Sequence, residues 1–97
     1  MNMQAMLKQA QALQKDMLKV KKEIDDSEFE GESSLVKVTL KGTKEVVKVN
    51  ISAEQLDSDD IDALQDMIVV AMNAAIKKID ETTEKKMGKF GNIPGLF

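Results

Sequence analysis

Apolar side chains recur at alternating intervals of three and four positions through the first 24 residues, and this feature most restricts how the chain can fold. The apolar positions of this seam are Met3, Met6, Ala10, Leu13, Met17, Val20 and Ile24. A heptad pattern kept over three repeats predicts one long amphipathic helix. We expect it to run from about Met3 to Asp25, a length of about 35 Å. Acidic residues at its end oppose the helix dipole and favour an end there.

A row of lysines and glutamines lies on the side of this helix opposite the seam. Its members are Gln4, Lys8, Gln11, Lys15, Lys19 and Lys22. Lysine rows are also common on helices that merely face solvent, so the row alone leaves both interpretations open. The chain has no Arg to read guanine edges and only three aromatic residues for stacking on single strands. Any nucleic-acid partner is therefore expected to be duplex DNA, bound chiefly through backbone charge and shape.

Charge is sorted into blocks along the chain, although the net charge is only -3. Residues 1–22 hold five Lys and one acid, whereas residues 23–32 and 54–66 each hold six acids and no Lys. The other Lys lie in residues 33–53 and 67–97, where they outnumber the acids. The local potential consequently need not follow the net sign, and an anionic partner is compatible with the acidic composition.

The middle of the chain changes to a period of two, which predicts an antiparallel hairpin. The alternating apolar residues are Val36, Val38 and Leu40 in the first run and Val47, Val49 and Ile51 in the second. The turn between them is expected at Lys41-Gly42-Thr43-Lys44. We expect a short strand near Phe29 before the hairpin, joined to it by a loop over residues 31–34. A sheet this small must pack against a helix or a second sheet.

A second helix is predicted after Asp57, because residues 57–60 supply an N-cap and acids for the first turn. Apolar residues then surround nearly the whole circumference from Ile61 to Ile76. Such a helix is buried on more than one side, so we expect a partner subunit to cover what the sheet cannot. The residues that we assign to the dimer interface are Val36, Val38, Val47, Val49, Met67, Val70 and Met72.

The end of this helix is polar and leads into a tail. Lys78, Lys85 and Lys86 form a second set of candidate phosphate contacts. Glycines and a proline interrupt the last ten residues. We therefore expect a single domain at residues 1–87 and a flexible C-terminal tail at residues 88–97.

The composition argues against an enzyme. The chain has no His and no Cys, which removes the usual general base, the thiol nucleophile and most zinc or iron ligands. Residues 57–68 do not make a calcium loop, because Asp62 and Ile68 stand where Gly and Glu are needed. We expect no catalytic residue, metal, cofactor or small-molecule substrate. With no apolar stretch long enough to span a bilayer and no signal peptide pattern, we expect a cytoplasmic protein with no membrane partner.

Five segments and a short Gly/Pro/Phe tail stand in a recognisable order. The segments are residues 6–15 (MLKQAQALQK), 35–38 (LVKV), 49–51 (VNI), 66–75 (DMIVVAMNAA) and 85–88 (KKMG). Together they resemble the YbaB/EbfC family of bacterial nucleoid-associated proteins over nearly the whole chain. The resemblance implies a homodimer whose sheets and central helices form the body, with projecting helical arms and DNA binding of little or modest sequence preference. Lys8 and Lys15 match the family's basic positions, whereas Ser33 and Ser34 replace residues that are often glycine.

The residues and the resemblance together predict an α+β fold: a long N-terminal helix, a small antiparallel β-meander and a long C-terminal helix. We expect an intertwined homodimer with protruding arms that binds duplex DNA in the nucleoid, mainly through phosphates and with low sequence specificity. It would contribute to chromosome organisation and gene regulation. The lysines expected at the DNA are Lys8, Lys15, Lys19, Lys22, Lys78, Lys85 and Lys86.

Two further partners belong to the expectations. A recombination or replication protein is a candidate partner beside DNA. The alternative function is a prefoldin-like chaperone subunit or a protein-docking scaffold. In that case the heptad seam and the Met residues would bind a protein, and the lysines would keep the arms soluble.

Overall fold

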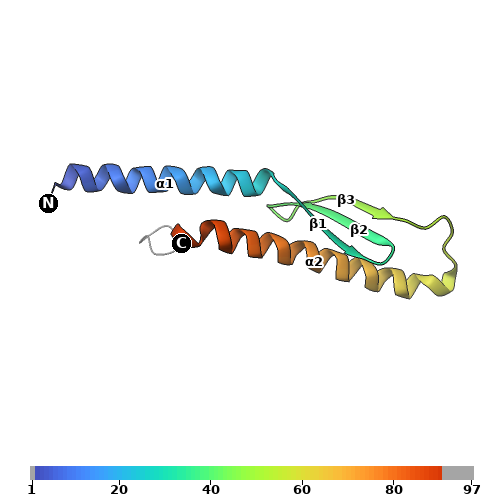
Figure 1. The fold of residues 1–97 in the computed structure, drawn as a ribbon. Coiled ribbons are helices and arrows are strands. Elements are labelled where there is room, and N and C mark those ends of the chain that lie inside the picture. The colour runs from blue at the N-terminus through green and yellow to red at the C-terminus, as the bar shows by residue number, and fades with distance from the viewer. Residues whose placement is uncertain (1, 91–97) are drawn as a thin grey trace.

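Two long helices joined by a three-stranded sheet make up the protein, whose computed structural model describes residues 2–90 (Figure 1). The elements in chain order are α1 (Met3–Asp26), β1 (Glu28–Ser33), β2 (Val36–Lys41), β3 (Val46–Ile51), the 3-10 turn η1 (Ser58–Asp60), α2 (Ile61–Met87) and the 3-10 turn η2 (Gly88–Phe90). The predicted α+β fold, with its helix, β-meander and helix in that order, is confirmed.

Helix α1 has the bounds that its sequence pattern predicts, within one residue at its end. The Asn2 side chain accepts a hydrogen bond of 3.0 Å from the backbone N–H of Gln4, which caps the first turn. Ser27 ends the helix, since its hydroxyl donates to the Glu23 carbonyl at 2.6 Å. Met17 and Ile24 are buried, whereas residues 2–16 are all exposed. The N-terminal half of α1 therefore projects beyond α2 as an arm (Figure 1).

The three strands form an antiparallel meander in the order β1-β2-β3. Val36 and Val38 of β2 lie opposite Ile51 and Val49 of β3, as the alternation predicts. A bulge beside Thr39 and Leu40 then shifts the register, so that Val46 rather than Val47 lies opposite Leu40. The regular alternation predicted through Val47 is wrong at this position, because the bulge adds one residue to β3.

The loop predicted at residues 31–34 is also shorter than expected. Strand β1 continues through Gly31 to Ser33, and only Ser34 and Leu35 form the turn. Gly31 is required for packing and not for a turn. A Cβ at this position would overlap the Ala71 carbonyl oxygen of α2 and lie 2.5 Å from the Ala75 backbone nitrogen. A glycine inside a strand often marks such a close approach of another backbone.

Helix α2 lies across β1 and β2 and supplies the main core (Figure 1). The buried residues of this core are Val36, Val38, Leu40, Ala71, Ala75 and Ile79. Asp57 and Asp60 close the 3-10 turn η1 that leads into α2, since the Asp60 carboxylate accepts a 3.0 Å hydrogen bond from the Asp57 N–H. The acidic segment therefore stands before the second helix as predicted, but Asp60, the N-cap residue of α2, makes no side-chain capping hydrogen bond.

The opposite face of the sheet is polar and internally paired. The Lys37 ammonium lies 3.1 Å from a Glu30 carboxylate oxygen and 3.7 Å from one of Glu32. The hydrogen bond and charge of Glu30, with a smaller contribution from Glu32, raise the pKa of Lys37 above its ordinary value. This lysine is therefore engaged by the acidic strand beside it.

The molecule is too elongated to cover its own apolar surface. It measures 71 × 18 × 15 Å and has a radius of gyration of 19.5 Å. A compact chain of this length would have a radius of gyration of about 13 Å. All six residues of β3 are exposed, although Val46, Val49 and Ile51 share the sheet face on which α2 packs. Helix α2 thus covers one side of the sheet only in part.

The chain after Met87 differs in part from the predicted tail. Residues 88–90 form a 3-10 turn, and the Phe90 side chain is buried in a second cluster with Met17, Ile24 and Met87. The Phe90 side chain packs where α1 and α2 meet, and this contact holds the turn against the two helices. The proposed boundary at residue 87 therefore moves to residue 90, and the rest of the predicted tail, residues 91–97, lies outside the described residues.

Candidate nucleic-acid interface

The structure brings four of the predicted lysines together on α1. Lys8, Lys15, Lys19 and Lys22 are all exposed and occupy one side of the helix. They span the free arm and the half of α1 that contacts α2. Met17 and Ile24, which face the second cluster, lie on the other side of the helix. The lysine row of α1 therefore points away from α2.

The other three predicted lysines form a separate row on α2. Lys78, Lys85 and Lys86 are exposed near the C-terminal end of that helix. Lys85 lies about 200° around the helix axis from Met87, which packs toward α1. The two rows consequently face outward from the two helices, and one protomer does not join them into a single surface.

None of these seven lysines belongs to an ion pair within residues 2–90. The pairs in this region use Lys21 with Asp25, Lys37 with Glu30 and Glu32, and Lys44 with Asp80. An ammonium without a carboxylate partner can approach a phosphate without first losing an internal contact. Both lysine rows are therefore electrostatically available to a polyanion.

The base of the arm is held against the β2–β3 turn. The Gly42 N–H donates a 3.0 Å hydrogen bond to the Ser27 carbonyl, just after α1 ends. A Cβ at Gly42 would overlap the Ile24 carbonyl oxygen, so only glycine allows this approach. The direction of the arm, and with it the place of Lys8 and Lys15, is thus set by contacts at Ile24 and Ser27.

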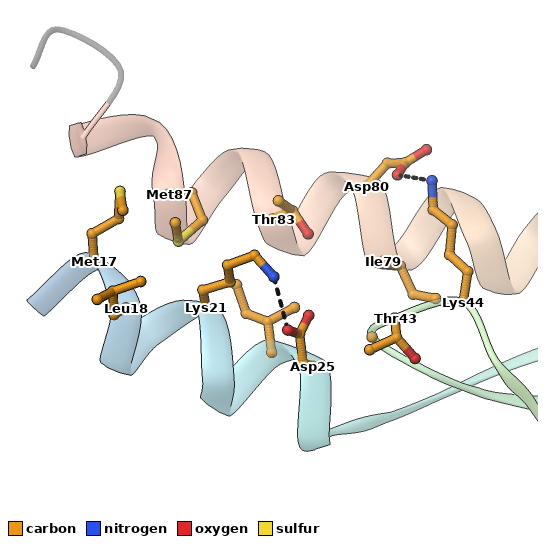
Figure 2. A pocket seen from close by; sticks show the side chains of 12 residues that line it. Met17, Leu18, Lys21, Asp25, Thr43, Lys44, Ile79, Asp80, Thr83 and Met87 are labelled. Carbon is orange, nitrogen blue, oxygen red and sulfur yellow. Dashed lines mark hydrogen bonds and ion pairs between the residues drawn. The ribbon is translucent and has the colours of Figure 1, made fainter. Parts of the chain in front are cut away.

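Beside this contact an open groove of about 760 Å³ lies between α1, α2 and the β2–β3 turn (Figure 2). Met17, Leu18 and Ile79 contribute apolar side chains to it. Two ion pairs stand along it, Lys21–Asp25 at 2.9 Å and Lys44–Asp80 at 3.1 Å. Figure 2 shows both pairs beside the apolar side chains. The Lys44–Asp80 pair links the turn to α2.

The residues assigned to a dimer interface fall into two groups. Val36 is 1% exposed and Val38 is 0% exposed, because α2 of the same chain already covers them. Their assignment to a subunit interface is wrong, since no surface is left for a second chain. Val47, Val49 and Val70 are 46%, 45% and 54% exposed, and Met67 and Met72 are half-buried.

Two further exposed residues, Val46 and Ile51, extend this surface but were missed by sequence reasoning about the interface. Both belong to β3, where Ile51 follows the predicted alternation and Val46 reaches the same face only because of the bulge. The alternation showed that one face of each strand is apolar. The alternation did not indicate which of the two strands α2 would leave uncovered.

Two other features of the described residues bear on the possible chemistry. Neither α1 nor α2 contains a segment long and apolar enough to cross a membrane. Among residues 2–90, no three acidic side chains are grouped closely enough to hold a metal ion.

Comparison with known proteins identifies the family. A model of the YbaB/EbfC DNA-binding family matches residues 1–93. The chain belongs to this family. A nucleoid-associated protein of Streptococcus suis (strain 05ZYH33) is 45% identical over 97 residues, which cover 97% of this chain and 98% of that protein. A nucleoid-associated protein of Ligilactobacillus salivarius (strain UCC118) is 44% identical over 99 residues, covering 99% and 95%.

A solved structure supports the fold of this family member. The crystal structure of an uncharacterized protein, HP0035, from Helicobacter pylori superposes with a TM-score of 0.74. The match covers 93% of this chain and 97% of that one at 20% sequence identity. The likeness at this identity concerns the fold, and the resemblance to the YbaB/EbfC family predicted from the sequence is confirmed by the family match.

Proposed function

We propose that this chain forms a homodimer that binds duplex DNA mainly through backbone phosphates, with low sequence specificity, and contributes to chromosome organisation and gene regulation in the nucleoid. Membership of a DNA-binding family and similarity to nucleoid-associated proteins support DNA as the partner. The observation that carries the mode of binding is the row Lys8, Lys15, Lys19 and Lys22, exposed along α1 and outside every ion pair of residues 2–90.

The chemistry of the row favours phosphate contacts over base contacts. Lysine presents a compact charge on a flexible stem and cannot form the planar, two-point contact that arginine makes with guanine. All 14 basic residues of the chain are lysines. Phosphate contacts orient a protein on DNA without reading sequence, so low specificity follows.

A salt titration tests this mode of binding. A dimer that contacts about six to eight phosphates should lose affinity with a log–log slope of about -5 to -7 against salt concentration. We expect similar slopes on unrelated duplexes, measured by fluorescence anisotropy. A steep slope on a single duplex alone would contradict low specificity. Absence of binding at low salt would remove the DNA function and favour the protein-docking alternative.

The homodimer is supported by apolar surface that one chain leaves open. Val49 on β3 and Val70 on α2 are about half exposed, and Met67 stands one helical turn before Val70. Exposed apolar surface of this kind on a small protein marks an interaction site. The elongated shape leaves room for a second chain against β3 and α2.

The dimer is tested by placing a charge in this surface. We expect Val70→Asp to convert the dimer to monomers, because a buried carboxylate without a partner is strongly unfavourable. Gln65→Asp is the matched control, since Gln65 is exposed on α2 about 140° around the helix from Val70. Light scattering after size exclusion gives the mass of each variant. A Val70→Asp protein that stays dimeric would place the interface elsewhere.

A further inference from the structure

The apolar seam of α1 packs against the end of α2 in its C-terminal half. Toward the N-terminus the seam continues beyond the end of α2. In its C-terminal half, Met17 and Ile24 are buried against Met87 and Phe90 at the end of α2. The same heptad positions continue toward the N-terminus, where no residue of 2–90 covers them. The exposed fractions there are 82% for Met3, 52% for Met6 and 39% for Leu13, and the flanking Leu7 is 60% exposed.

We propose that this free seam, consisting of Met3, Met6, Ala10 and Leu13, pairs with the same seam of a second copy running antiparallel, so that neighbouring dimers on DNA join arm to arm. The inference rests on the proposed function, because it explains how bound dimers contact one another. Its occupant is a second copy of this chain, and the following observations support that choice.

The spacing of the seam suits a helix as its partner. Apolar residues spaced by three and four pack as knobs into the holes of another helix with the same spacing. Helix α2 is already used along residues 17–24 of α1. The positions that flank the free seam are Leu7, Gln9 and Gln14, which are uncharged. Two identical arms therefore meet without like-charge repulsion along these flanks.

The shape of the protomer selects the antiparallel direction. In a parallel pair, both bodies would begin beside residue 17 at the same end and would compete for space. In an antiparallel pair, the bodies lie at opposite ends of an overlap formed by residues 3–13, about 16 Å long. Met3 then lies opposite Leu13 of the second copy, and Met6 lies opposite its Ala10.

Arm pairing leaves the lysines free for DNA. Lys8 and Lys15 occupy the heptad position opposite the seam, so both contacts can form at once. The seam is short and includes one alanine, so a single pair of arms is expected to be weak in dilute solution. Binding to one DNA molecule raises the local concentration of the arms and makes this weak contact effective.

Engineered cysteines test the geometry directly, since the natural chain contains no cysteine. Dimers of Met6→Cys and dimers of Ala10→Cys are mixed on a long duplex under mild oxidation. We expect disulfide bonds between the two variants, giving four-chain species, to form at least about tenfold faster than between Ala5→Cys and Ala12→Cys dimers, whose cysteines lie off the seam. Equal rates, or reaction of Met6→Cys only with itself, would overturn the antiparallel pairing.

A second pair of variants separates arm pairing from DNA binding itself. Met6→Gln with Leu13→Gln removes the seam, and Ala5→Gln with Ala12→Gln adds the same amides at the same spacing off the seam. On a short duplex that holds one dimer, both variants should bind like the natural protein. On a duplex that holds several dimers, only the seam variant should lose cooperativity and about tenfold in apparent affinity.

The two proposals fail in different ways. Natural protein that binds neither duplex would overturn the DNA function, and the cysteine reaction at high concentration without DNA would still decide the arm pairing. A seam variant that keeps full cooperativity on the long duplex would overturn the pairing alone. A seam variant that is weak already on the short duplex would also overturn it, by placing the seam at the DNA.

Discussion

Reversal of charge at Lys8 and Lys15 is expected to lower the affinity for duplex DNA by about 100-fold or more at moderate salt. In the proposed mode of binding, each substitution to Glu removes a phosphate contact and adds a repulsive charge, and the proposed dimer carries both changes twice. The two side chains are exposed and belong to none of the ion pairs in residues 2–90, so the fold loses no internal contact. Fluorescence anisotropy with circular dichroism as a folding check measures the effect.

A control with equal charge separates position from net charge. Lys48→Glu with Lys77→Glu also changes the net charge of each chain from -3 to -7, because each Lys to Glu change alters it by two. Both lysines are exposed and lie outside the two predicted rows. We expect this control to bind within a few-fold of the natural protein, the residual loss being long-range repulsion. Equal losses in the two variants would show that net charge, and not the α1 row, governs binding.

Gly31→Ala is expected to destabilise the protein by about 3 kcal/mol, a large part of the stability of a domain this size. The added methyl group would overlap the Ala71 carbonyl oxygen, which belongs to the backbone of α2 and cannot rotate away. Helix α2 would have to lift from β1, and the core of Val38, Ala71 and Ala75 would loosen. For a domain of 60–100 residues this corresponds to a fall in Tm of about 12–24 °C.

The same substitution at Gly88 is the matched control. Nothing lies within 4 Å of a Cβ built there, and the residue has helical dihedral angles, with φ of -58°. Alanine suits such a position better than glycine, so Gly88→Ala should leave Tm unchanged or raise it by a few degrees, roughly 0.5–1 kcal/mol. Thermal unfolding followed by circular dichroism compares the two. A Gly31→Ala protein as stable as Gly88→Ala would mean that α2 does not approach β1 this closely.

Much of the fold follows from local patterns in the sequence. The heptad seam predicted α1 to within one residue at its end, and the period-two runs predicted the β2–β3 hairpin. The acidic cap at Asp57 predicted the start of the second helix. These elements depend on periodicity and capping, which are properties of neighbouring residues.

The errors occurred where contacts between distant residues decide the structure. Gly31 resembled a loop glycine, because the approach of α2 that requires a glycine there is made by residues 40 positions later. Val36 and Val38 were assigned to a partner subunit, but α2 of the same chain covers them. Phe90 lies between Gly88 and Gly91 in a segment with tail-like composition, yet it is buried against α1.

For the candidate interface, the spacing of residues along the chain predicts which lysines share a helix face, since a regular helix converts spacing into direction. The composition also favours phosphates over base edges as the target, since the chain has lysine and no arginine. The outward directions of the two lysine rows depend on how α1 and α2 pack against each other, which no local pattern predicts. Only the packing of α2 across β1 and β2 decided which apolar surface stays open, because this depends on where two elements meet and not on the pattern within either.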